Sequence, residues 1–154
     1  MAILNNKQRI GKYEVIRLIK ENNYCETYRI EDEKEEPFFL KLFILKNTPE
    51  KMLDENHKVV CIDYMSKLRH KNIVSYVERG TYNDEKVGEC EYVITNYFSG
   101  ELLADKLMRE GSMPIEDALK VMNDILDSLK FMHERSMFHN DITPRNIMLS
   151  ERIV

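Results

Sequence analysis

The sequence is poor in the residues that mark several classes of protein. Its 154 residues include no tryptophan, five glycines and three cysteines. Cys25, Cys61 and Cys90 lack a metal-binding spacing, which favours free thiols in a reducing compartment and a cytoplasmic location. No apolar run approaches the ~20 residues that span a bilayer, and the N-terminus lacks the apolar core of a signal peptide. A formal net charge of -4 argues against nucleic-acid and membrane-surface partners.

The first two thirds of the chain predict an antiparallel sheet. β-forming residues alternate with polar turns, and the charged run 31–36 is expected to be an exposed hairpin tip. The strands are predicted over residues 13–19, 26–30, 38–44, 72–82 and 91–98.

Helices are predicted in three places. Thr48-Pro49-Glu50 is typical of a helix start, because it offers an N-cap, a proline at the first position and an acid near the positive end of the dipole. That helix is expected to run from 48 to 68. A short helix follows at 101–109, and apolar residues at helical spacing predict a long one at 115–135. The order indicates an α+β chain, with a sheet lobe at 1–95, a linker at 96–100 and a helical lobe at 101–154.

The segment His139–Asn146 carries the clearest chemistry. It places Asp141 and Asn146 five residues apart in a polar loop between the long helix and an apolar strand. Such an aspartate can accept the proton of an attacking hydroxyl, and the asparagine amide oxygen can bind Mg²⁺. The segment alone is equally compatible with a surface loop built from Asx turns.

The chain resembles the protein kinase superfamily in several motifs that occur in the family's order. His139–Asn146 is similar to the H-R-D-x-x-x-x-N signature, and Phe39-Leu40-Lys41 falls where the family keeps the lysine of V-A-I-K. Leu68–Val74 resembles the run after helix C, Tyr92–Tyr97 the fifth strand and hinge, and Leu129–His133 the end of the helix before the catalytic loop. The resemblance implies a kinase-like α+β fold with a five-stranded antiparallel N-lobe sheet, a helix C and the first C-lobe helices.

The same resemblance implies roles for individual residues. Lys41 would hold the α- and β-phosphates of ATP, Asp141 would be the catalytic base, and Asn146 would be catalytic as a ligand of Mg²⁺. A nucleotide site is implied for Lys20, Asn22, Lys41, Thr95 at the gatekeeper position, Asn96, Tyr97 and Phe98. The implied partners are ATP and a protein substrate or regulatory partner.

Several positions depart from the family pattern. The three glycines of the phosphate loop are replaced by Lys20, Asn22 and Cys25, which predicts weaker or differently posed nucleotide binding. Lys20 could neutralise phosphate, and Asn22 tolerates unusual dihedral angles. The helix C glutamate falls on Cys61, which cannot form an ion pair with Lys41. Glu55 and Asp63 are candidate substitutes.

The loop itself also departs from the pattern, and three functions stay open. Asn140 replaces the arginine of H-R-D, and Thr143 stands where Ser/Thr kinases usually have lysine, although Pro144 favours Ser/Thr over Tyr specificity. The first hypothesis is a protein kinase. The alternatives are a pseudokinase acting as an interaction module, and a small-molecule kinase of the aminoglycoside or choline type.

The family's D-F-G motif would lie beyond Val154. We therefore expect the chain to be the N-terminal part of a longer protein and to be inactive by itself. We also expect the helix at 115–135 to expose apolar surface, and to bury it by pairing with a second copy or by segment exchange.

Overall fold

In the computed structural model, which describes residues 2–150, the chain forms two compact units. The sheet unit comprises the described residues up to 69 together with 74–97. The helical unit comprises residues 70–73 together with those from 98 onward.

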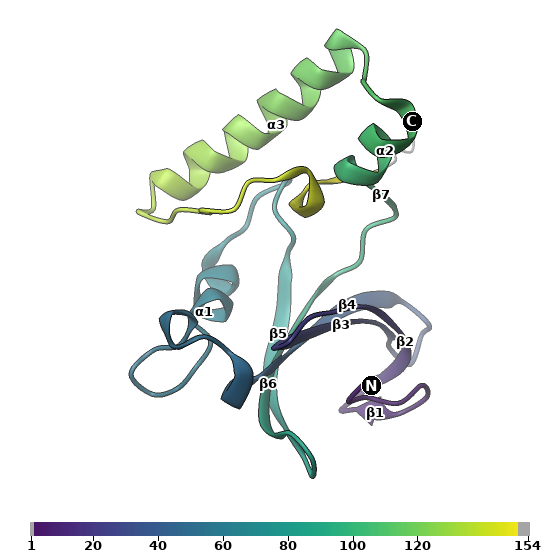
Figure 1. Cartoon of the computed structure of the whole chain (residues 1–154), viewed down its shortest axis with the longest axis vertical. Coiled ribbons are helices and arrows are strands. Elements are labelled where there is room, and N and C mark those ends of the chain that lie inside the picture. The colour runs from purple at the N-terminus through teal and green to yellow at the C-terminus, as the bar shows by residue number, and fades with distance from the viewer. Residues whose placement is uncertain (1, 151–154) are drawn as a thin grey trace. The chain divides into compact units, whose positions relative to one another are not determined.

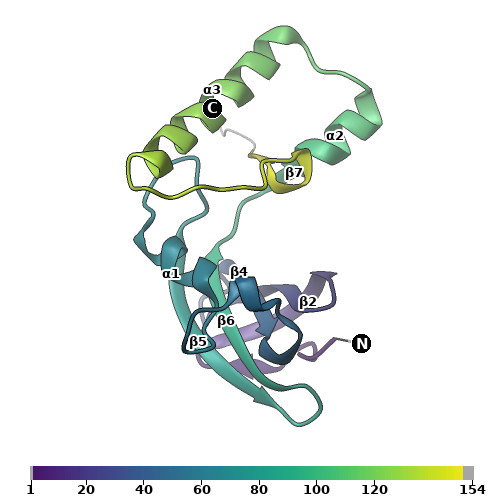
Figure 2. The same ribbon diagram turned by 60° about the vertical axis from the view of Figure 1, so that its left-hand side comes forward.

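The sheet unit is built on six antiparallel strands in the order β1-β2-β3-β4-β6-β5 (Figure 1). The long strands are those expected from the sequence, and β5 and β6 form an extended hairpin (Figure 2). The sixth strand is the short β1, which pairs with β2 and was not among the five expected. The strands span Arg9–Ile10 (β1), Tyr13–Glu21 (β2), Cys25–Glu31 (β3), Pro37–Ile44 (β4), Tyr76–Asp84 (β5) and Gly88–Asn96 (β6).

The expected hairpin tip at 31–36 joins β3 to β4. The Oδ1 of Asp32 accepts hydrogen bonds from the backbone N–H of Lys34 at 2.9 Å and of Glu36 at 3.0 Å. Glu35 takes a positive φ of 61° to close the turn. The charged run is therefore a side-chain-capped turn, which fixes the register of β3 against β4.

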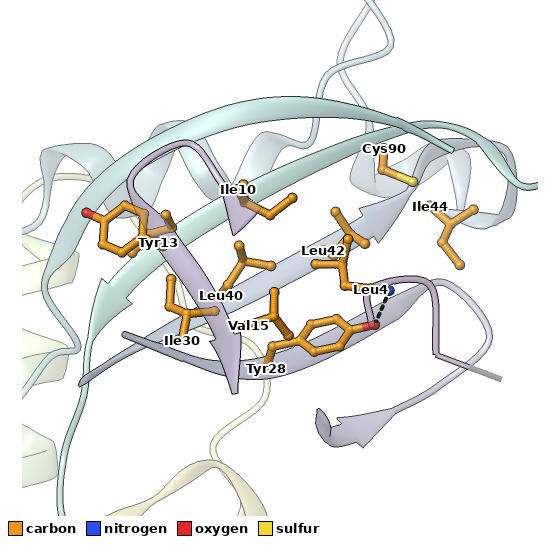
Figure 3. Packing of buried hydrophobic residues seen from close by; sticks show 11 residues of the cluster. Leu4, Ile10, Tyr13, Val15, Tyr28, Ile30, Leu40, Leu42, Ile44 and Cys90 are labelled. Atoms are coloured by element: carbon orange, nitrogen blue, oxygen red, sulfur yellow. Dashed lines mark hydrogen bonds between the residues drawn. The ribbon is translucent and has the colours of Figure 1, made fainter. Parts of the chain in front are cut away.

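One face of the sheet holds the larger core (Figure 3). Its buried members come from β1, β2, β3, β4 and β6 and from the N-terminal segment. The N–H of Leu4 donates to the Tyr28 hydroxyl at 3.0 Å, and the N–H of Ile3 donates to Glu26 Oε2 at 3.0 Å. Tyr28 in turn donates to Glu26, so the N-terminal segment is anchored to β3 by satisfied buried polar groups. The fully buried core residues include Leu4, Tyr13, Val15, Tyr28, Ile30, Leu40, Leu42 and Ile94.

The opposite face is covered by the helix α1, Val60–Lys67. A second cluster there joins Phe43 of β4 and Val93 of β6 to Val59 and Ile62. Because residues alternate between the faces of a strand, Phe43 and Lys41 point to the α1 side, whereas Leu40 and Leu42 point to the larger core.

The helix predicted over 48–68 is wrong for residues 48–59, since α1 begins at Val60. Thr48 is not an N-cap there, because its hydroxyl donates back to the carbonyl of Ile44 at 2.9 Å. Asp54 then forms an Asx turn, accepting from the N–H groups of Asn56 and Lys58 at 2.8 and 2.9 Å, and this turn prevents a continuous helix. The segment before α1 instead contains two 3-10 turns, Leu45–Asn47 and Glu50–Met52.

The helical unit contains two helices and a small sheet. α2 spans Leu103–Glu110 and α3 spans Ile115–His133, close to the two helices expected from the sequence. The strands β7, Gly100–Leu102, and β8, Met148–Ser150, pair antiparallel. Within residues 2–150, no helix combines the length and the apolar character needed to cross a membrane.

Candidate active site

The sheet register places the two predicted phosphate-binding lysines in one row. Lys20 of β2 pairs with Thr27 of β3, Thr27 pairs with Lys41 of β4, and Lys41 pairs with Val93 of β6. Directly opposed residues of an antiparallel pair share a face. The row therefore brings Lys20 and Lys41 to the α1 side of the sheet, separated by one strand.

Lys41 has thiols as its neighbours on this face. Burial raises the pKa of Cys25 to about 11, and it also raises the pKa of Cys61, while the positive charge of Lys41 opposes both shifts. Both thiols are therefore neutral near pH 7. Among residues 2–150, no carboxylate forms an ion pair with Lys41, so its ammonium group is available to an anionic ligand.

A different ion-pair network holds α1 against the sheet. Arg79 of β5 forms ion pairs with Asp63 of α1 and with Glu91 of β6. The other oxygen of Glu91 accepts the backbone N–H of Val59, just before α1, at 2.7 Å. We call these four residues the α1 latch. Asp63 thus binds Arg79 and does not replace the missing partner of Lys41.

The α1 latch was not found by reading the sequence. Glu91 is only 2% exposed, and its position inside the apolar strand β6 was the available signal. A carboxylate in a buried strand needs donors within the fold. Nothing in the sequence indicates that those donors come from β5 and from the residue before α1.

Asn22 closes the turn between β2 and β3. Its Oδ1 accepts the N–H groups of Tyr24 at 3.0 Å and of Cys25 at 2.8 Å, and its own N–H donates to the carbonyl of Cys25 at 2.9 Å. In a glycine-rich loop such N–H groups face phosphate. Here the side chain of Asn22 uses two of them, so Asn22 shapes the loop, and its φ is not among the positive values of the described residues.

The predicted hinge residues begin at the end of β6. Thr95 is buried and pairs with Phe39 of β4. The N–H of Asn96 donates to the carbonyl of Ser75 at 3.0 Å, and the ring of Tyr97 packs on Phe39 with a centroid separation of 4.7 Å. Phe98, the last predicted nucleotide contact, belongs to the helical unit.

The predicted catalytic loop lies in the helical unit and brings Asp141 and Asn146 together. The Nδ2 of Asn146 donates to the carboxylate Oδ2 of Asp141 and to its backbone carbonyl, both at 2.9 Å. The N–H of Asp141 donates to the Nδ1 of His139 at 3.2 Å. Asn140 adopts a φ of 63°, a left-handed conformation that asparagine tolerates better than most residues.

This arrangement presents oxygen atoms to solvent. Because the Nδ2 of Asn146 is the donor to Asp141, its Oδ1 is left without a donor among the described residues. Oxygen ligands from a carboxylate and an amide suit Mg²⁺. A polar hollow of about 500 Å³ also lies in the helical unit, but it is lined by residues of β7, α2 and β8 and excludes Asp141 and Asn146.

Residues 13–154 match the family model described as "Protein kinase domain". CBL-interacting serine/threonine-protein kinase 3 of Arabidopsis thaliana is 28% identical over 148 residues, which cover 93% of this chain and 31% of that protein. Serine/threonine-protein kinase PksC of Streptomyces coelicolor is 34% identical over 93 residues, or 57% of this chain and 16% of that protein. The chain belongs to the protein kinase family.

A solved structure similar to this chain is Rad53 in complex with AMP-PNP. Its TM-score is 0.73 at 19% identity, with 92% of this chain and 35% of that chain covered, which shows the same fold. The chain spans a third or less of the length of the first curated relatives. Because these relatives are protein kinases, neither the pseudokinase nor the small-molecule kinase alternative is favoured.

Proposed function

We propose that this protein takes part in phosphoryl transfer from ATP to serine or threonine hydroxyls of a protein. The observation that carries the proposal is the hydrogen bond between Asn146 and Asp141, since it holds the proposed base and the proposed metal ligand together in one loop. The named relatives are serine/threonine-protein kinases, and Rad53 was solved with AMP-PNP, an analogue of ATP.

Each residue has a stated task in this proposal. Asp141 accepts the proton of the attacking hydroxyl, and its carboxylate is oriented for this by the Nδ2 of Asn146. Asn146 offers its Oδ1 to Mg²⁺, which when bound neutralises charge on the phosphate oxygens. Lys41, unpaired among residues 2–150, binds phosphate, and Lys20 adds positive charge from the neighbouring strand.

The loop at Asn22 limits this binding. Two of its backbone N–H groups are already bonded to the Asn22 side chain, so they contribute less to holding phosphate than those of a glycine loop. We therefore propose that lysine side chains, rather than backbone donors, supply most of the phosphate affinity.

The direct test is transfer of labelled phosphate from Mg-ATP to a mixture of serine- and threonine-containing peptides. The assay uses a form of the protein that transfers phosphate. In that form, Asp141→Asn should lower the rate of phosphate transfer at least about 100-fold while ATP binding persists. Asp117→Asn, a change in the exposed first turn of α3, is the matched control and should retain the rate. Turnover that survives in Asp141→Asn would refute the proposed base.

The second partner that we propose is another copy of the chain. The outer side of α3 carries large apolar residues that are more than half exposed, and such surface favours association. They are Ile115, Leu119, Met122 and Leu126.

A further inference from the structure

Phe39 occupies the part of the sheet face that lies between the two nucleotide-binding positions. It precedes Lys41 by two residues in β4, so both side chains share the α1 side, about 7 Å apart along the strand. Across the sheet, Phe39 pairs directly with Thr95, two residues before Tyr97. A nucleotide with its phosphates at Lys41 and its base at the end of β6 must therefore cross the position of Phe39.

That position is filled by an aromatic stack. The rings of Phe39 and Tyr97 have centroids 4.7 Å apart with planes tilted by 40°. The guanidinium of Arg29, which pairs with Phe39 from β3, lies 5.2 Å from the centre of the Tyr97 ring. Contacts of both kinds are attractive. We call these three residues the Phe39 stack.

The side chain at this position is large for its family. The V-A-I-K motif has alanine two residues before the lysine, and this chain has phenylalanine there. The extra ring occupies space that an alanine leaves open above the strand. Phe38, the preceding residue, points to the other face of the sheet and packs against Tyr13. Of these two phenylalanines, Phe39 alone takes up space on the face where the nucleotide would bind.

The Phe39 stack contains one buried hydrogen-bond donor that lacks an acceptor among the described residues. The Nη2 of Arg29 donates to Glu31 Oε1 at 3.0 Å, but its Nε is buried and has no hydrogen-bond partner within the described part of the chain. An unsatisfied buried donor destabilises the arrangement that contains it. An open arrangement in which this Nε finds an acceptor would gain that hydrogen bond and lose the ring contacts.

We infer that Phe39 is a gate for the nucleotide base. In the closed arrangement its ring lies on Tyr97 and excludes the base from the face beside Thr95. The base binds only after the ring turns away, so base affinity is lowered whereas phosphate binding at Lys41 and Lys20 is not. This inference rests on the proposed ATP site. It identifies Phe39 as the residue that determines how strongly that site binds the nucleotide base.

The experiment compares the wild-type 154-residue chain with Phe39→Ala by calorimetry. Three ligands separate the parts of the site: adenosine for the base, inorganic tripolyphosphate for the phosphates, and Mg-ATP for both. Phe39→Ala should tighten adenosine and Mg-ATP binding by about tenfold or more and leave tripolyphosphate unchanged. Phe39→Val, which keeps a β-forming residue, should give a smaller change in the same direction.

Phe38→Ala is the matched control, since it removes the same ring from the opposite face and should not alter affinity for any of the three ligands. Circular dichroism checks that each variant keeps the fold. Unchanged or weaker adenosine binding in both Phe39 variants overturns the gate. If tripolyphosphate and Mg-ATP still bind in that case, the proposed function survives. If no variant binds any of the three ligands, the gate and the proposed ATP site both fail.

Discussion

At the scale of single residues, Arg79 joins three elements, because it lies on β5 and forms ion pairs with α1 and with β6. Its guanidinium is the only described ion-pair partner of Glu91, a carboxylate that is almost completely removed from water. Without that partner, Glu91 would retain only the N–H of Val59. A buried charge with one donor is unfavourable, so a single substitution in the α1 latch should lower stability strongly.

We predict that Arg79→Met lowers the free energy of unfolding by about 3 kcal/mol or more, since it removes one partner of a buried ion pair. Urea unfolding followed by circular dichroism measures the loss. Arg9→Met is the control, because the Arg9–Glu33 pair is exposed and its N–O distance is 3.7 Å, and it should cost less than about 1 kcal/mol. Equal losses in the two variants would contradict the role given to the latch.

Among the elements, the turn between β2 and β3 depends on Asn22. Asn22→Ala removes the acceptor of two backbone N–H groups, and we expect stability to fall by about 1–2 kcal/mol. The neighbouring Asn23 is a matched control, because it contributes its backbone carbonyl, which accepts the side-chain amide of Asn47 at 3.0 Å. In thermal unfolding, Asn23→Ala should therefore melt close to the wild type, and a similar fall in both variants would argue against the Asn22 acceptor.

The sequence predicted the elements that depend on local patterns. β-forming runs located the long strands, and apolar spacing located α3, because these signals act within a few residues. The helix prediction at 48–68 was wrong for residues 48–59 because the signal at Thr48 belongs to a local turn, and Asp54 forms an Asx turn that interrupts a helix there. Motif order selected Lys41, Asp141 and Asn146 as candidate site residues. The partners of Glu91 and the ring contact of Phe39 could not be predicted, because they involve strands that are distant in sequence.

At the scale of the whole molecule, the exposed side of α3 predicts self-association. Light scattering of the 154-residue chain at micromolar concentration should give a mass above that of the monomer. The double change Leu119→Glu and Leu126→Glu places charges on the apolar side and should restore the monomer, because burying them without partners is unfavourable. Lys120→Glu is the control: it reverses a charge beside the apolar side without removing apolar surface, so this variant should still associate. A monomeric wild-type chain at this concentration would contradict the prediction.

The pairing of β7 with β8 also sets an order of events during synthesis. The strands of the sheet unit pair largely with neighbours in the sequence, and all of them are complete once residue 96 has been made. Within residues 2–150, β7 pairs only with β8, and its residue Leu102 pairs with Met148 on the far side of α2 and α3 in the sequence. Closing that long loop has an entropic cost, and it cannot begin before β8 exists. While the ribosome makes the intervening helices, the sheet unit can already be folded, but the start of the helical unit must wait for the residues that follow the catalytic loop.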